Sequence, residues 1–345
     1  MGQQKNTAFQ PALAALQKGI ETHFYLNASG YYREHAEPAR NKKPVSYLWP
    51  LCALIQAENE LDALQQKSGG VDRIWTAMQK YYDDRKPAPG FASYPPEKGG
   101  GDRFYDDNQW IGIALMDGYK REKKEAWQEG AKGICRFMMT AYDTVSGGGL
   151  YWEEGKWTSK NTCSNGPGII LALQLYQSTG QHSYLDTALL LYKWVNLHLR
   201  DRNGLYIDNI AIPSGKPDLR RYSYNTGTMM QSNLYLYEIT KDTGYLAEAK
   251  IIAAVAADYF LGTGRFRDGL WFNAVLLRAY QHLAGIDRNT VYLTKFAACV
   301  KNEIRDAQLA NGLFVHKNQT VDLVNQAGML EILARLSYLE TQFQF

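Results

Sequence analysis

The chain has 345 residues and a formal net charge of +3, and 45% of its residues are hydrophobic and 21% charged. This composition is that of an ordinary globular protein with a large core, and the small charge leaves no basic surface for nucleic acid. No run of 18 apolar residues occurs, which argues against a membrane-spanning helix. The four cysteines and six histidines show no metal-binding spacing. We therefore expect a monomer without metal, cofactor, nucleic-acid partner or membrane span.

Helical segments dominate the chain from its beginning. Apolar periodicity predicts helices over 8–26, 48–64 and 71–82. A repeated unit follows, in which a helix ends in an aromatic residue, a short polar turn comes next, and a second helix begins. The turn is of the Thr-Gly type, in which glycine closes the first helix. The aromatic residues that mark the repeat are Tyr119, Tyr176, Tyr237, Tyr280 and Tyr338.

The number of helix pairs points to a closed ring. Roughly six pairs fit in the chain once boundary errors are allowed for. The chain is thus predicted to be all-α, an (α/α)6 barrel with a site in loops at one rim. An open solenoid of the same pairs is the alternative. No linker or low-complexity stretch interrupts the sequence, so we predict a single domain over 1–345.

Long loops between the pairs are expected to carry function. They cover 86–103, 143–164, 201–226, 262–271 and 311–325. In three of them an Asn-Gly or Asp-Gly turn is predicted to lead into a short extended aromatic segment. These turns lie within 202–206, 267–271 and 310–314.

Two adjacent carboxylates, Asp106 and Asp107, stand between Phe104-Tyr105 and Asn108-Gln109-Trp110. One of them could cap a helix while the other interacts with the helix dipole. Two carboxylates in an aromatic-lined cleft are also what cleavage of a glycosidic bond needs. The pattern alone leaves both interpretations open. If both are catalytic, neighbours in sequence favour the separation of about 5–5.5 Å that goes with retention, over the 6.5–9.5 Å of inversion.

Two further helices are predicted to begin with a dense set of small polar groups. Asn165 begins one of them, and Tyr224 and Asn225 begin the other. A helix cap would need only one such residue. Equivalent helix starts face one rim of a ring, so we predict substrate contacts from these three residues together with Tyr105 and Asn108.

Aromatic residues make up 13% of the chain, and several fall in predicted loops. Aromatic faces stack on the C–H faces of sugars, which makes Trp49, Trp152 and Trp271 candidate sugar platforms beside Tyr105. Packing in a helical core is the alternative for such residues. Asp208 follows an extended turn and is a further candidate contact, or else a structural turn residue.

Three motifs together resemble glycoside hydrolase family 76. They are Tyr-Asp-Asp-Asn-Gln-Trp from Tyr105, Ser-Asn-Gly-Pro from Ser164, and Tyr-Asn-Thr-Gly-Thr-Met from Tyr224. The resemblance covers roughly residues 10 to 340. Members of this family are endo-α-1,6-mannanases with an (α/α)6 barrel. The chain departs from the family at Gln109, where Glu is common, and after Asp208, where Gly is common.

The resemblance implies a retaining endo-α-1,6-mannanase that needs no cofactor and acts on α-mannan. In the family the first aspartate of the pair is the nucleophile and the second the general acid/base, which implies these roles for Asp106 and Asp107. Two alternatives remain: an enzyme on another glycan, of the unsaturated-uronyl hydrolase type, or a non-catalytic glycan-binding protein. The N-terminus lacks a secretory apolar region. We expect an extracellular, cell-surface or periplasmic protein whose signal peptide has been removed.

Overall fold

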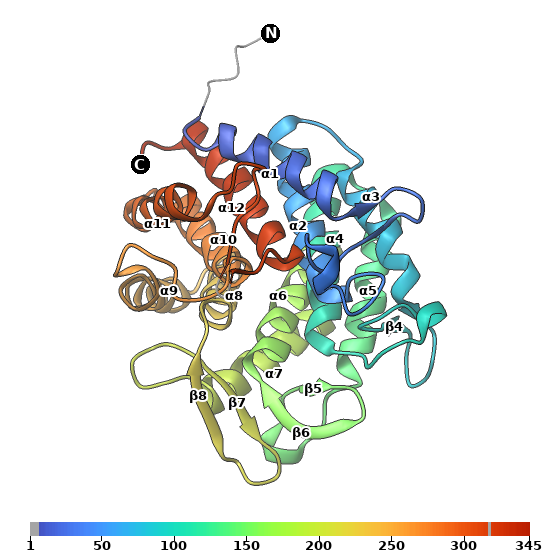
Figure 1. The fold of residues 1–345 in the computed structure, drawn as a ribbon. Helices are drawn as coiled ribbons and strands as arrows, with labels where there is room; N and C mark the ends of the chain where they lie inside the picture. Colours follow the sequence, from blue (N-terminus) through green and yellow to red (C-terminus); the bar gives the residue numbers. More distant parts are fainter. Residues whose placement is uncertain (1–6, 317–318) are drawn as a thin grey trace. The chain divides into compact units, whose positions relative to one another are not determined.

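The structure is a computed structural model that describes residues 7–316 and 319–345 (Figure 1). Its contacts group the chain into two compact units. One holds the described residues up to Ala77 together with Ala257–Phe345, and the other is Met78–Ala256. The single domain expected over 1–345 stays a prediction. Across the described ranges, no helix has the length and apolar character needed to cross a membrane.

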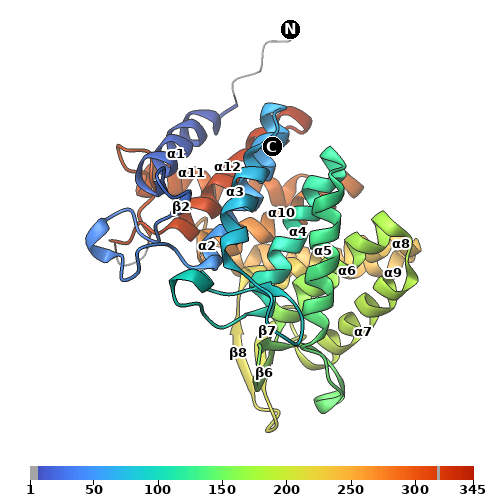
Figure 2. The ribbon, with the colours of Figure 1, turned by 90° about the vertical axis from the view of Figure 1, so that its right-hand side faces the viewer.

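The unit Met78–Ala256 is built on three helix pairs. The pairs are α4 (Tyr105–Glu122) with α5 (Glu125–Met139), α6 (Thr162–Thr179) with α7 (His182–His198), and α8 (Ser223–Thr240) with α9 (Thr243–Ala256). The first helices of the pairs also pack side by side, α4 on α6 and α6 on α8 (Figure 2). They are buried on nearly every side, whereas α5 buries one stripe only. The repeat predicted from the sequence is thus present in this unit.

A glycine was predicted to close the first helix of each pair, and this prediction holds at one turn and fails at another. Gly180 adopts a left-handed φ of 70° and closes α6, with its N–H bonded to the carbonyl of Tyr176. Gly244, predicted to close α8, lies inside α9 instead. Lys241 takes the left-handed position there, and the Asp242 carboxylate accepts the N–H of Gly244 at 2.8 Å. The chain thus ends α8 with a left-handed lysine, and an Asp side chain satisfies a backbone N–H at the start of α9.

The other unit contains the remaining long helices. They are α1 (Gln10–His23), α2 (Leu48–Gln65), α3 (Gly70–Met78), α10 (Leu270–Asp287), α11 (Val291–Ala307) and α12 (Leu323–Gln342). Helix α12 packs on α1, α2 and α10, and α11 packs on α10. A π-helical turn, η5 (Ala257–Leu261), precedes α10. The helix predicted over 48–64 is confirmed, and helices are present within 8–26 and 71–82. The first of these ends at His23, before strand β1, and the other ends in a 3-10 turn, η2 (Gln79–Tyr81), before Tyr82 enters strand β3.

A four-stranded antiparallel sheet joins two of the predicted loops. Its strands, in sheet order, are β5 (Tyr151–Glu153), β6 (Lys156–Asn161), β7 (Ile207–Ala211) and β8 (Pro217–Arg221) (Figure 1). The central pairing sets Ser159 opposite Ala211. Two two-stranded ladders complete the β structure: β1 (Tyr25–Leu26) with β2 (Tyr31–Tyr32), and β3 (Tyr82–Asp83) with β4 (Gly90–Phe91).

Two of the three predicted Gly turns are confirmed. Gly204 and Gly312 have φ values of 88° and 84°, and each lies in a turn whose ends form an isolated β-bridge. The third prediction is wrong, because Gly269 has a φ of −58° and directly precedes α10. Trp271 therefore lies in the first turn of a helix and not in a loop. Trp49 on α2 and Tyr224 on α8 also lie in first helical turns, in agreement with the helices predicted over 48–64 and from Tyr224.

Candidate active site

Asp106 and Asp107 occupy the second and third positions of α4. The residue before the helix is Phe104, in an extended conformation, so neither aspartate is the N-cap. Both side chains are nearly buried, with 5% and 6% of their surface exposed. Backbone N–H groups of a first helical turn favour a negative charge there. Neither aspartate is therefore a cap, while the first-turn position that favours an interaction with the helix dipole holds for both.

Two side chains act on the Asp106 carboxylate. Trp152 on β5 donates its indole N–H to Oδ2 at 3.2 Å, and its ring packs on Phe104 with centroids 4.9 Å apart. The thiol of Cys163, at the second position of α6, also acts on this carboxylate and lowers its pKa. Burial raises the pKa of Asp106 to about 6, while the hydrogen bonds from Cys163 and Trp152 act in the opposite direction. The carboxylate is thus ionised at neutral pH.

The pKa of Asp107 is also raised. Its burial, and then the neighbouring charge of Asp106, raise its pKa well above the usual value for a carboxyl. Two adjacent carboxyls whose pKa values are pushed apart can act as a base or nucleophile and as an acid.

Further polar side chains of the same unit interact with Cys163 and, through it, with Asp106. The Tyr224 hydroxyl donates to the thiol of Cys163. Asp208 on β7 exerts its charge on that hydroxyl and that thiol, and Asn225 on α8 acts to lower the pKa of the Asp208 carboxyl. The structure thus gathers most of the predicted site residues of this unit. They are Asp106, Asp107, Trp152, Asp208, Tyr224 and Asn225.

Cys163 is a member of the cluster that the sequence did not predict. Burial, followed by the charges of Asp106 and Asp208, raises its pKa well above the usual value, so it is a neutral thiol and a donor. A signal was available, since Cys163 immediately precedes the polar helix start at Ser164 and Asn165. A cysteine in such a position has no motif of its own, and only the packing of α6 beside α4 brings it to Asp106.

Asn108, a predicted substrate contact, instead holds the backbone of β4. Its Oδ1 accepts the N–H of Phe91 at 2.7 Å, and its Nδ2 donates to the carbonyl of Phe91 at 3.0 Å. An amide side chain can pair with a peptide group in this way as a neighbouring strand would. The side chain is fully buried. We therefore do not propose a substrate contact for Asn108.

The same pairing of a side-chain amide with both backbone groups of one residue occurs in the first turn of two other helices. Asn165 on α6 holds both backbone groups of Leu150, at 2.8 and 3.0 Å. In the other unit, Gln326 on α12 holds both groups of Phe314, at 2.7 and 2.8 Å. Each amide ties the start of its helix to the extended segment that precedes it. Asn165 is fully buried and is likewise not proposed to contact substrate.

Tyr105 is also a packing residue. Its ring stacks on Phe137 with centroids 4.9 Å apart, and its hydroxyl lies 3.1 Å from that of Thr140. Only 1% of its surface is exposed. A ring with its face covered by Phe137 cannot also stack on a sugar, so a platform role is not proposed for it.

Trp49 and Trp271 belong to the unit that contains α2 and α10. Their rings pack edge to face, with centroids 4.2 Å apart and an interplanar angle of 76°. Trp49 is partly exposed and Trp271 is buried. Their role as sugar platforms stays a prediction. Over residues 7–316 and 319–345, no group of three or more His, Cys, Asp or Glu side chains is placed to hold a metal ion.

Comparison with known proteins gives concordant results at the level of family and fold. The model of glycosyl hydrolase family 76 matches residues 10–276. The mannan endo-1,6-alpha-mannosidase DCW1 of Candida glabrata is 33% identical over 152 residues, which are 39% of this chain and 34% of that protein. DFG5 of Candida albicans, of the same description, is 33% identical over 175 residues, 45% of this chain and 38% of that protein. The matched stretches thus span about a third of the length of these relatives.

Solved structures match over nearly the whole chain. A family 76 alpha-mannanase from Bacteroides thetaiotaomicron has a TM-score of 0.90 at 25% identity, and the match covers 98% of both chains. An inactive double Asp-to-Asn variant of the alpha-1,6-mannanase of Salegentibacter sp. HEL1_6, in complex with alpha-1,6-mannotriose, has a TM-score of 0.81 at 21% identity and covers 96% of this chain and 99% of that one. The predicted fold class, the all-α (α/α)6 fold of these proteins, is confirmed. With its family model matching over 10–276, the chain belongs to glycosyl hydrolase family 76.

Proposed function

We propose that this protein is a retaining endo-α-1,6-mannanase, with Asp106 as the nucleophile and Asp107 as the general acid/base. The observation that carries the proposal is the buried pair of adjacent carboxyls at the start of α4, whose pKa values are both raised by burial. The relatives named as mannan endo-1,6-alpha-mannosidases, and the related structure with bound alpha-1,6-mannotriose, support the choice of substrate.

The reaction would proceed in two displacements. In the first, Asp107 gives its proton to the glycosidic oxygen while an Asp106 oxygen bonds to the anomeric carbon and the glycosidic bond breaks. In the second, Asp107, now ionised, takes a proton from water. The water oxygen bonds to the anomeric carbon, and the ester to Asp106 breaks. Each carboxyl is then back in its initial state, and the product keeps the α configuration.

Other side chains of the cluster would bind the sugar. Trp152 is 38% exposed and offers a ring to a mannosyl unit while its N–H orients Asp106. Asp208, Tyr224 and Asn225 carry polar groups that suit sugar hydroxyls. An extracellular, cell-surface or periplasmic location is part of the same proposal, because an intact polysaccharide does not cross a cell membrane and its hydrolase must meet it outside the cytoplasm.

The direct test is hydrolysis of linear α-1,6-mannan followed by proton NMR from the first minutes. We expect internal cleavage, with oligosaccharides of mixed length, and α-anomers as the first product. β-Anomers among the first products would show that the enzyme inverts the configuration and does not retain it. An uncleaved but bound chain would overturn the proposed reaction in favour of the glycan-binding alternative.

Replacing Trp152 by Phe should separate its two roles. The variant keeps an aromatic face but loses the donor to Asp106, so the pKa of that carboxyl should rise. We expect kcat to fall on the order of tenfold, the size of a lost hydrogen bond to a charged group. The acidic limb of the kcat/KM profile should move to higher pH.

The matched control is Trp157→Phe on β6. Trp157 is about half exposed and packs on Tyr151, with no contact to Asp106. This variant should keep the parental pH profile. An identical profile for Trp152→Phe would show that the indole N–H does not tune the nucleophile.

A further inference from the structure

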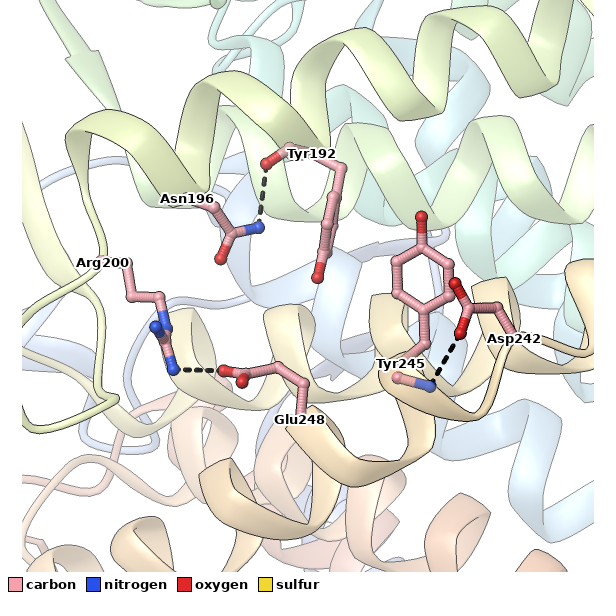
Figure 3. A pocket seen from close by; sticks show the side chains of 7 residues that line it. Tyr192, Asn196, Arg200, Asp242, Tyr245 and Glu248 are labelled. Carbon is pink, nitrogen blue, oxygen red and sulfur yellow. Dashed lines mark hydrogen bonds and ion pairs between the residues drawn. The ribbon is translucent and has the colours of Figure 1, made fainter.

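A pocket of about 460 Å³ lies between α7 and α9 (Figure 3). This volume is within the range of small-ligand sites, about 300–1,000 Å³. The pocket shares no residue with the cluster around Asp106. It is lined by Tyr192, Asn196, Arg200, Asp242, Gly244, Tyr245 and Glu248.

The aromatic wall of the pocket is held rigidly. The Tyr192 hydroxyl donates to Oδ1 of Asn233 at 2.7 Å, and Asn233 is fully buried and anchored to the carbonyl of Met229. Tyr245 packs edge to face on Tyr192, with centroids 5.7 Å apart and an angle of 74°. Figure 3 shows the Tyr192 ring standing between Tyr245 on one side and Asn196 on the other.

The polar wall is also set in place by the fold. Asn196 donates from Nδ2 to the carbonyl of Tyr192 at 2.9 Å, and its Oδ1 accepts the hydroxyl of Tyr206 at 2.8 Å. An amide retains a second hydrogen and a second lone pair after two such bonds. Arg200 and Glu248 form an ion pair that closes the pocket on the side facing away from Tyr245. The amide, guanidinium and carboxylate groups are therefore already in place before a ligand binds, which reduces the entropy cost of binding.

The charges of the pocket select a neutral ligand. The guanidinium of Arg200 is already paired with Glu248, and Asp242 adds a negative charge, so an anion has no free cation to bind. A cation would have to compete with Arg200 for Glu248. A pyranose suits the combination, because its C–H face stacks on a tyrosine and its hydroxyls bond to planar amide, guanidinium and carboxylate groups.

We propose that this pocket is a second, non-catalytic binding site for a neutral hexosyl unit. It would hold one part of the mannan polymer while other parts of the same polymer are cleaved at the active site. The identity of the polymer rests on the proposed function. Holding a long substrate at a second point raises the effective concentration of its bonds at the active site. An oligosaccharide that is too short to reach from one place to the other gains nothing from this.

The experiment compares the parent with the double variant Arg200→Ala/Glu248→Ala, which removes both members of the ion pair and leaves neither charge unpaired. Lys193→Ala is the matched control, since Lys193 is exposed on α7 and does not line the pocket. We expect the KM for polymeric α-1,6-mannan to rise about tenfold in the double variant, a modest loss of avidity. The kcat/KM for α-1,6-mannotetraose should stay at the parental value, and the control should match the parent on both substrates.

A binding measurement separates this site from the proposed reaction. Affinity electrophoresis in gels with neutral polysaccharides, α-1,6-mannan among them, would use Asp106→Asn protein with and without the double substitution. Weaker retardation by the double variant supports the pocket even if the parent cleaves none of the polymers. Equal retardation, or an equal loss of activity on tetraose and polymer, overturns the proposal whatever the parent cleaves.

Discussion

Asp106→Asn is expected to lower kcat on α-1,6-mannan by on the order of 10⁴-fold or more, as removal of a nucleophile does in other two-step hydrolases. The amide oxygen of asparagine is too weak a nucleophile to form the ester with the anomeric carbon. The side chain keeps its size, and Trp152 can still donate to the new amide oxygen. We therefore expect an unchanged far-ultraviolet circular dichroism spectrum.

The same substitution should change how stability depends on pH. The pKa of Asp106 is about 6 in the folded protein and about 3.9 in an unfolded chain. The folded state thus binds this proton more tightly, so its stabilising effect is present below about pH 4 and is lost as the pH rises to about 6. The asparagine variant lacks this loss, and its thermal midpoint should fall less than that of the parent between pH 4 and 7.

Asp83→Asn is the control for both measurements. Asp83 is paired with Arg85 at 3.3 Å and is not part of the cluster around Asp106. We expect parental turnover from this variant. Substantial mannan hydrolysis by Asp106→Asn would remove Asp106 from the nucleophilic role.

Asp107→Ala should produce a different defect. Loss of general acid/base catalysis costs about 10²–10⁴-fold on the natural substrate. An aryl glycoside with a good leaving group, such as a 2,4-dinitrophenyl α-1,6-mannobioside, needs no proton for the first step. The mannosyl ester should therefore form at close to the parental rate and accumulate. The basic limb of the pH profile, which we assign to the raised pKa of Asp107, should disappear.

Azide tests the assignment of roles. A small anion can enter the space left by the carboxyl and attack the ester without a base, which should restore turnover and give the α-mannosyl azide. A β-configured azide would instead assign the nucleophilic role to Asp107. An absence of rescue, with no accumulated ester, would exclude a two-step reaction at this pair.

The helix pairs could be predicted because their signals are local. Apolar periodicity follows from the 3.6-residue repeat of a helix, and the recurring tyrosine marks the end of the first helix of each pair. These features placed α4 to α9 correctly. The errors arose where two local solutions compete. Gly244 and Gly269 were both predicted to lie in turns. At Gly244, the Asp242 side chain accepts the backbone N–H at the start of α9. Gly269 is itself the residue that precedes α10.

The roles of the amide residues could not be separated from sequence. Asn108, Asn165 and Asn225 all lie in the first turn of a long, nearly buried helix, and all looked like candidates for sugar binding. The first two pair with backbone groups of Phe91 and Leu150. Which partner an amide takes depends on the extended segment that packs on it, and that segment lies 15 to 17 residues away in the chain.

The sequence by itself determined the helical repeat, the aspartate pair at a helix start and the likeness to family 76, because each depends on residues close together in the chain. The tertiary structure decided the pKa shifts of the pair. Burial raises both pKa values, while Trp152 on β5 and Cys163 on α6 act to lower that of Asp106. Trp152 and Cys163 lie 46 or more residues from Asp106 in the chain, and solvation and charge act through space, so only the folded chain determines these shifts.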